Sequence, residues 1–253
     1  MKKTILLFIT ILFSAAYSFS QNCVTDSENR TEITENIKEN NFIAHIVVHR
    51  NRKRTFNATV SFISPKTLIG AGHSFRERWY TKIKKIELFI GQRNENGENI
   101  YTEKHVFTRD EIKLWVDPVF QKKGSPDFDF ALVSLPKNIV SDFFKLNTFE
   151  KVKTKTETVN INGYPGDKGN KALWTKNTTV NNITEKENVL LHDMFTYTGD
   201  SGAPIWSKIN NTYYLIGVHG TGHYRNGSCN AGIKLTDERI SLIENFVKTN
   251  SVK

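Results

Sequence analysis

The sequence predicts an all-β fold, either a sandwich or a barrel, with one helix at the C-terminal end. Short runs rich in β-branched and aromatic residues recur from residue 42 onward. Clusters of turn-forming residues separate them, for example at 94–97 and 163–167. Long helical segments do not alternate with these runs, which disfavours a parallel α/β sheet.

The clearest strand candidates are short apolar runs. They cover residues 42–49, 59–63, 85–90, 130–135, 158–161 and 213–218. A chain of 253 residues with 17 Phe, 8 Tyr and 4 Trp also has enough apolar material to bury a core. These strands are therefore expected to fold together rather than to belong to a disordered chain.

A helix is expected near the C-terminus. Thr236 can cap it, and Asp237 and Glu238 suit its first turn because carboxylates are stabilised at a helix N-terminus. The apolar residues that follow fall on one face of a helix, namely Ile240, Ile243, Phe246 and Val247. This face predicts packing against the strands.

The first twenty residues have the organisation of a cleaved signal peptide. Two lysines precede an apolar run at 4–16, and Ser18 and Ser20 are small residues at the two positions that a signal peptidase reads. The run is too short for a span of about 20 residues, so we expect a secreted or periplasmic protein without membrane insertion. Residues 21–41 are polar, and we interpret them as a leader or propeptide arm with little to bury. Residues 42–253 remain as the folded domain.

Composition excludes several classes of site. Two cysteines cannot form a four-thiolate metal centre, and no His-Glu-x-x-His motif is present, so we expect neither a metal nor another cofactor. Outside the cytoplasm Cys23 and Cys229 can pair, although a sequence does not show disulfide geometry. The net charge of +9 suits nucleic acid, an anionic surface or an acidic substrate, but no nucleic-acid-binding motif accompanies it.

The most informative segment is the turn at 197–204. Ser201 stands between glycines, where a tight turn exposes its hydroxyl and lets the amides of Gly199 and Ser201 converge on one point. Such a pair of N–H groups is what the oxyanion of an acyl-transfer intermediate requires. Taken alone, this pattern is more often a plain loop.

A nucleophilic serine needs a base, and the base needs a carboxylate. His73 follows the apolar run ending at Gly70, in a turn of small residues. Asp129 opens the buried run at 130–135 and is the preferred carboxylate, while Asp127 competes for the same role. Each assignment is weak by itself, because a turn histidine and a strand-end aspartate also have ordinary structural roles.

In the order His, Asp, Ser, these segments resemble the chymotrypsin-like serine proteases, and within them the secreted bacterial glutamyl endopeptidases. The likeness spans residues 42–248, and a run at 162–168 adds to it. The four segments that carry it are Ala71-Gly72-His73, Asp129-Phe130-Ala131-Leu132-Val133, Gly199-Asp200-Ser201-Gly202-Ala203-Pro204 and Ile216-Gly217-Val218-His219.

The resemblance implies two six-stranded antiparallel β-barrels with the active site between them and a C-terminal helix packed on the second. It assigns His73 as general base and then acid, Asp129 as its orienting carboxylate, and Ser201 as nucleophile. Gly199 and Ser201 would supply the oxyanion-hole amides. It also implies polypeptide substrates, and we expect a monomer.

The same resemblance implies cleavage after Glu, and less readily after Asp. His219 and Thr196 occupy the positions that line the pocket for the side chain before the scissile bond, and the strand edge Gly220, Thr221 and Gly222 would pair with the substrate backbone. Phe195 stands where a trypsin-like pocket needs a carboxylate. The nearest alternative is a chymotrypsin-like protease of other specificity.

A second alternative is a non-catalytic binding module on the same fold. The basic cluster Arg50, Arg52, Lys53 and Arg54 could then hold anionic polymers. Binding of such a polymer would also require aromatic residues or a groove beside this cluster, and the sequence shows neither. The complete set of His73, Asp129 and Ser201 favours the enzyme.

Overall fold

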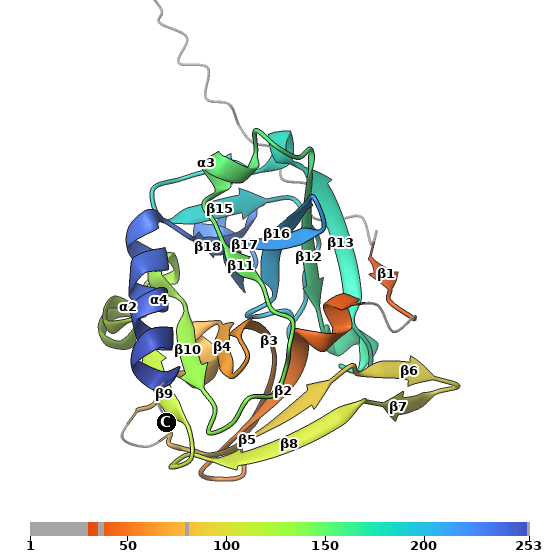
Figure 1. Ribbon diagram of the computed structural model, residues 1–253, viewed down its shortest axis with the longest axis vertical. Helices are drawn as coiled ribbons and strands as arrows, with labels where there is room; N and C mark the ends of the chain where they lie inside the picture. Colours follow the sequence, from red (N-terminus) through yellow and green to blue (C-terminus); the bar gives the residue numbers. More distant parts are fainter. Residues whose placement is uncertain (1–29, 35–37, 79–80, 252–253) are drawn as a thin grey trace, which may run out of the picture.

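The computed structural model describes residues 30–34, 38–78 and 81–251. Two curled antiparallel sheets lie one above the other, with a long helix along one side (Figure 1). The predicted signal peptide at 1–20 lies outside the described residues, as does Cys23. The all-β class and the C-terminal helix are confirmed.

The first sheet has seven strands in the order β8-β5-β2-β3-β4-β10-β9. Their bounds are β2 Ile43–Arg50, β3 Thr55–Ser64, β4 Thr67–Gly70, β5 Ile83–Ile90, β8 Glu103–Thr108, β9 Lys113–Val116 and β10 Ala131–Ser134. A separate hairpin is formed by β6 Arg93–Glu95 and β7 Glu98–Ile100.

The second sheet has nine strands within the described residues, in the order β1-β13-β12-β16-β17-β18-β15-β14, with β11 paired in parallel to β17. Their bounds are β1 Thr31–Glu32, β11 Lys145–Leu146, β12 Thr158–Gly163, β13 Trp174–Thr179, β14 Thr184–Glu185, β15 Val189–His192, β16 Pro204–Ile209, β17 Thr212–Thr221 and β18 Asn230–Lys234. The described residues thus form two curled sheets of seven and nine strands, where the resemblance implies six strands in each barrel.

Helices are few and short apart from the last. They are α1 Gly72–Phe75, α2 Pro118–Lys123, α3 Phe149–Val152 and α4 Asp237–Ser251. Single 3-10 turns complete the fold, namely η1 Lys38–Asn41, η2 Pro126–Phe128, η3 Gly166–Lys168, η4 Val180–Asn182 and η5 Tyr224–Asn226.

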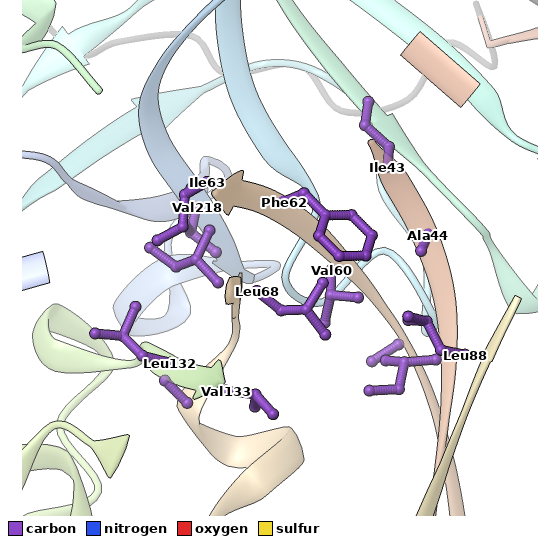
Figure 2. Close-up of a cluster of buried hydrophobic side chains, with 14 of the residues drawn as sticks. Ile43, Ala44, Val60, Phe62, Ile63, Leu68, Leu88, Leu132, Val133 and Val218 are labelled. Atoms are coloured by element: carbon purple, nitrogen blue, oxygen red, sulfur yellow. The ribbon is translucent and has the colours of Figure 1, made fainter. Parts of the chain in front are cut away.

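One apolar core runs from the first sheet into the second. Figure 2 shows side chains of β2, β3, β4, β5 and β10 gathered together with Val218 of β17. Alternation along each strand turns these side chains to one face, and the curl of the sheet removes that face from water. Because both sheets contribute to this core, loops at their junction are held in fixed positions.

Helix α4 begins where the sequence predicts. The hydroxyl of Thr236 accepts from the amide of Arg239 at 3.2 Å, which caps the first turn. Ile243 is fully buried on the predicted apolar face. The helix lies against β10 of the first sheet (Figure 1), so the expectation that it packs on the second barrel is wrong. Its apolar face reaches the part of the shared core that the first sheet contributes.

The packed domain begins earlier than residue 42. Strand β1 adds to the edge of β13 in the register Thr31 to Thr175, and Ile33 is buried while its amide donates to the carbonyl of Leu173 at 2.8 Å. The expectation that this arm has little to bury is corrected by Arg30 and Ile33, which are both buried. A strand of two residues has no periodic pattern, so it could not be recognised from the sequence alone.

Candidate active site

A buried carboxylate holds an imidazole where the first sheet faces the second. His73 lies in α1, which follows β4, and Asp129 lies shortly before β10, separated from it by Phe130. The Nδ1 atom of His73 is 2.6 Å from Oδ2 of Asp129, and the backbone amide of His73 donates to Oδ1 at 2.7 Å. Asp129 is 4% exposed, whereas the side chain of His73 is 40% exposed. One edge of the ring is therefore fixed while the ring remains accessible.

Asp127 has other partners. Its carboxylate accepts from the hydroxyl of Tyr224 and pairs with Arg225 at 2.8 Å, both on η5. Of the two carboxylates that the sequence left in competition, the structure joins Asp129 to His73.

Two glycines enclose the Asp129 carboxylate. A Cβ atom at Gly72 would lie 3.0 Å from Oδ1, and one at Gly220 would lie 3.3 Å from Oδ2. Side chains at either position would crowd the carboxylate away from the imidazole. Gly220 therefore has a positioning role besides the backbone-pairing role that the sequence suggests.

Ser201 is carried by a tight turn that needs glycine on both sides. The backbone φ of Gly199 is +105° and that of Gly202 is +89°, which side chains rarely adopt. The turn is closed by two hydrogen bonds, from the amide of Asp200 to the carbonyl of Tyr197 at 3.0 Å and from the Tyr197 amide to the Asp200 carboxylate at 2.8 Å. Ser201 therefore lies on a turn held in shape by its glycines, and it is partly exposed.

Thr59 of β3 holds this turn against the first sheet, and the sequence analysis missed it. Its amide donates to the carbonyl of Ser201 at 2.9 Å, and its hydroxyl donates to the carbonyl of Gly199 at 2.9 Å. With these carbonyls fixed, the amides of Gly199 and Ser201 form no hydrogen bond within the described residues. No motif marks Thr59, because it acts through an inward position on an ordinary strand.

The predicted residues meet around a cleft of about 630 Å³. Gly199 is buried in the turn and does not line this cleft. The predicted site residues on the cleft wall are His73, Asp129, Thr196, Ser201, His219, Gly220, Thr221 and Gly222.

His219 lies on β17 in contact with a second histidine that sequence reasoning missed. Its Nδ1 atom is 3.3 Å from Nε2 of His192, and both rings are buried. Burial, followed by the nearby His73, lowers the pKa of His219 to about 3, and burial chiefly holds the pKa of His192 well below its ordinary value. Both rings are therefore uncharged near neutral pH. His192 ends an apolar strand, a position that a structural histidine also takes.

The hydroxyl of Thr196 is oriented by Asn230 of β18. The buried amide of Asn230 donates to Thr196 Oγ1 at 3.0 Å and to the carbonyl of Met194 at 2.8 Å. Since the hydroxyl accepts from Asn230, its own hydrogen remains available to a ligand in the cleft. Asn230 was also missed, because an isolated asparagine in a strand has no motif.

Arg30 of the N-terminal arm supports the segment before the serine. Its guanidinium forms a two-atom ion pair with Asp167, with Nη1 to Oδ1 at 3.0 Å, and lies 4.6 Å above the ring of Phe195. The Arg30 ion pair lowers the pKa of Asp167. Asp200, whose carboxyl is buried nearby, has its pKa raised to about 7 by that burial, and Arg30 partly offsets the effect.

Cys229 is disulfide-bonded, but the pairing with Cys23 stays a prediction because Cys23 lies outside the described residues. Within the described residues, no group of three or more His, Cys, Asp or Glu side chains is arranged to hold a metal ion. No helix in that same part of the chain is long and apolar enough to cross a membrane.

Comparison with known proteins gives one curated relative and several solved structures. The chain is 27% identical over 237 residues to a glutamyl endopeptidase of Bacillus licheniformis, covering 90% of this chain and 70% of that protein. A Glu endopeptidase solved with MPD shares the fold with a TM-score of 0.68 and 23% identity, covering 88% of this chain and 98% of that chain. No protein-family model matches the chain.

The same fold also occurs in an inactivated relative. A scabies mite inactivated protease paralogue matches with a TM-score of 0.63 and 14% identity, covering 85% of this chain and 98% of that chain. The fold alone therefore does not establish catalysis. The chain therefore has the fold of these solved proteases, and its sequence is similar to that of a glutamyl endopeptidase.

Proposed function

We propose that the chain is a secreted serine endopeptidase that hydrolyses peptide bonds through an acyl-enzyme on Ser201. The observation that carries this proposal is the contact of 2.6 Å between His73 Nδ1 and Asp129 Oδ2, on the wall of the cleft that also contains Ser201. A serine beside an imidazole that a buried carboxylate orients is the arrangement that activates a hydroxyl for attack.

The proton moves by way of the His73 ring. Asp129 accepts from Nδ1–H, which leaves Nε2 as the acceptor for the Ser201 hydroxyl proton during attack on the substrate carbonyl. The imidazolium formed in this step is stabilised by the Asp129 carboxylate. It then donates the proton to the leaving amine, and water repeats the sequence to release the acyl group.

The amides of Gly199 and Ser201 bind the oxyanion. Both N–H groups lack partners within the described residues, and Thr59 fixes the two carbonyls of the same turn at 2.9 Å. Donors that are already oriented stabilise a developing negative charge without reorganisation.

The side chain before the scissile bond is Glu, and less readily Asp. The Thr196 hydroxyl has a free hydrogen because Asn230 donates to its oxygen at 3.0 Å. When His192 donates to Nδ1 of His219, the Nε2–H of His219 can donate to a carboxylate. The curated relative is itself a glutamyl endopeptidase. A substrate lysine or arginine would be bound poorly, because Phe195 occupies the position where a trypsin-like pocket needs a carboxylate.

The first test is digestion of a denatured protein mixture with the parent and Ser201→Ala proteins. We expect cleavage sites read by mass spectrometry to follow Glu and to disappear in the Ser201→Ala protein, with a rate loss of at least about 10³-fold. Ser141→Ala, an exposed serine away from the cleft, serves as the matched control. Equal digestion by Ser201→Ala would contradict the mechanism, and inactivity of the parent would favour a binding module.

The second test is Thr196→Val, which removes the hydroxyl and keeps the side-chain shape. We expect kcat/KM for a peptide with Glu before the scissile bond to fall about tenfold, because a charge-assisted hydrogen bond is lost. Thr179→Val, on the exposed face of β13, should leave this value unchanged. A parent enzyme that cleaves Glu and Gln peptides equally well would instead support another specificity.

A further inference from the structure

A second hollow adjoins the active-site cleft at His73. Its volume is about 270 Å³, and it shares His73 and Phe120 with the larger cleft. Phe56 forms another part of its wall and is 43% exposed. Four arginines also line it and make it cationic, namely Arg50, Arg54, Arg76 and Arg78. The basic cluster of the β2–β3 hairpin thus has the groove and aromatic context that its sequence alone does not show.

Arg50 places a positive charge in the floor of this hollow. The residue is 5% exposed, and its guanidinium donates to three carbonyl oxygens, those of Ser74, Arg76 and Thr81, at 2.8 to 3.1 Å. Carbonyl groups orient the guanidinium without neutralising it. An anion in the hollow would therefore meet a fixed positive charge.

The remaining arginines lie nearer the surface. Arg76 is fixed by hydrogen bonds of its Nε and Nη2 atoms to the carbonyl of Gln121 at 3.1 and 2.7 Å, above the ring of Phe120. Arg54 is exposed, and its guanidinium forms no ion pair within the described residues. Arg54 can therefore turn toward a ligand without breaking an existing pair.

No acidic residue lines the hollow among those that the structure describes. The neighbouring carboxylate, Glu77, acts on Arg50 through its charge, but its hydrogen bonds go to other groups, because it accepts from the amide of Ile83 at 3.0 Å and from Nε of Arg109 at 3.1 Å. The hollow is therefore cationic, with apolar walls suited to the methylene groups of a side chain that ends in a carboxylate.

The role of His73 in the reaction indicates which part of a substrate would reach the arginine hollow. The pocket residues Thr196 and His219 lie in the larger cleft, on the acyl side of the scissile bond. His73 protonates the leaving amine, so the residues that follow the scissile bond pass His73. The arginine hollow lies beside His73 and outside the pocket of the acyl side.

We propose that the arginine hollow is a subsite for an acidic side chain at the first or second position after the scissile bond. The proposal rests on the proposed endopeptidase function and extends it to the leaving fragment of the substrate. Glu fits better than Asp, because its longer stem can lie along Phe56 and Phe120.

Internally quenched peptides test this subsite. Each carries Glu before the scissile bond and Glu, Gln or Lys at the first or second position after it. We expect kcat/KM for Glu to exceed that for Gln by about threefold to tenfold at one of the two positions, as for a partly exposed arginine–carboxylate pair. In Arg54→Gln this ratio should fall toward one, and Arg54→Lys should retain part of it.

Arg52→Gln is the matched control. Arg52 is exposed on the same hairpin and carries the same charge, but it does not line the hollow. The Glu-to-Gln ratio should survive in Arg52→Gln. A parent ratio of one, or an equal fall in Arg52→Gln and Arg54→Gln, would overturn the subsite and leave only long-range attraction.

A binding measurement tests the subsite independently of the proposed endopeptidase function. Fluorescence anisotropy of a labelled Glu peptide and its Gln counterpart is measured with Ser201→Ala protein, with and without Arg54→Gln. Tighter binding of the Glu peptide that is lost with Arg54→Gln supports the subsite even when the parent hydrolyses nothing. Equal affinity for both peptides refutes the subsite even when hydrolysis is fast.

Discussion

At the scale of single residues, the contact between Asp129 and His73 carries the strongest claim about chemistry. The buried carboxylate accepts both from the ring and from the backbone amide of His73, at 2.6 and 2.7 Å. It therefore fixes the position of the ring and also which nitrogen holds the proton. A carboxylate that served only as a strand-end cap would not need the contact with the ring.

Asp129→Asn tests this arrangement. The amide keeps the side-chain shape but can donate to the ring nitrogen, which favours the wrong tautomer of His73. We expect kcat to fall on the order of 10⁴-fold with little change in the thermal unfolding midpoint. Asp127→Asn is the control, because Asp127 pairs with Tyr224 and Arg225 instead. Similar values of kcat for the two variants would show that Asp129 does not orient the base.

The residues found only in the structure share a physical property. Thr59, His192 and Asn230 act on the site through hydrogen bonds to other protein groups, at 2.9 to 3.3 Å. Their roles depend on which strands lie next to each other. A motif records the residues that chemistry requires at fixed spacing along the chain, so it detects Ser201 and cannot detect Thr59.

At the scale of elements, the local sequence pattern predicts the longer strands and the last helix, but it does not predict strand β1 of the N-terminal arm. The strand expected at 213–218 lies within β17, and the capped helix begins at Asp237. Strand β1 has two residues and is held by the edge of β13 and by the ion pair of Arg30 with Asp167. Such a strand is specified by its neighbours, which only the folded chain brings together.

Arg30→Ala tests whether the arm supports the site. The change leaves Asp167 without its ion-pair partner Arg30 and removes the cation above Phe195, next to Thr196. We expect the free energy of unfolding to fall on the order of 2 kcal/mol and KM for a Glu peptide to rise more than kcat falls. Urea unfolding and steady-state kinetics measure the two effects.

Lys38→Ala provides the matched control for the arm. Lys38 pairs with Asp142 at 2.8 Å, but both side chains are about half exposed, so the pair should contribute little. Activity and stability of Arg30→Ala equal to those of Lys38→Ala would show that the arm is dispensable once the domain has folded.

At the scale of the whole molecule, the site exists only where the two sheets meet. His73 and Asp129 lie next to strands β4 and β10 of the first sheet, whereas Ser201 precedes β16 of the second sheet and His219 lies on its strand β17. Thr59 joins them across the junction, and Val218 extends the shared core. Loss of packing between the two sheets should therefore also disrupt the site. Acid should affect both.

The buried histidines predict how stability depends on pH. The pKa of His219 is lowered to about 3 and that of His192 lies well below its ordinary value, both chiefly through burial. Histidine in the unfolded chain titrates near a pKa of about 6.5. Below that pH the unfolded state binds protons that the folded state excludes, so the free energy of unfolding decreases as the pH falls toward 3.

Asp200 has the opposite effect. Burial raises its pKa from 3.8 to about 7, so between these values the folded state holds a proton that the unfolded chain has released. Stability from this group therefore decreases as the pH rises from about 4 to 7. Burial also lowers the pKa of His45, so three buried histidines oppose this one carboxyl. Acid should therefore destabilise the protein on balance.

Urea unfolding at pH 4, 5, 6 and 7 distinguishes the two contributions. His192→Gln keeps a hydrogen-bonding side chain beside His219 and removes one titrating ring, so it should flatten the pH dependence by about 1.4 kcal/mol per pH unit between pH 4 and 6. Asp200→Asn can still accept from the Tyr197 amide and should steepen the same slope by a similar amount. Opposite changes in slope are expected because the folded state excludes protons at His192 and retains one at Asp200. Parallel curves for both variants and the parent would mean that neither group titrates differently in the folded and unfolded states.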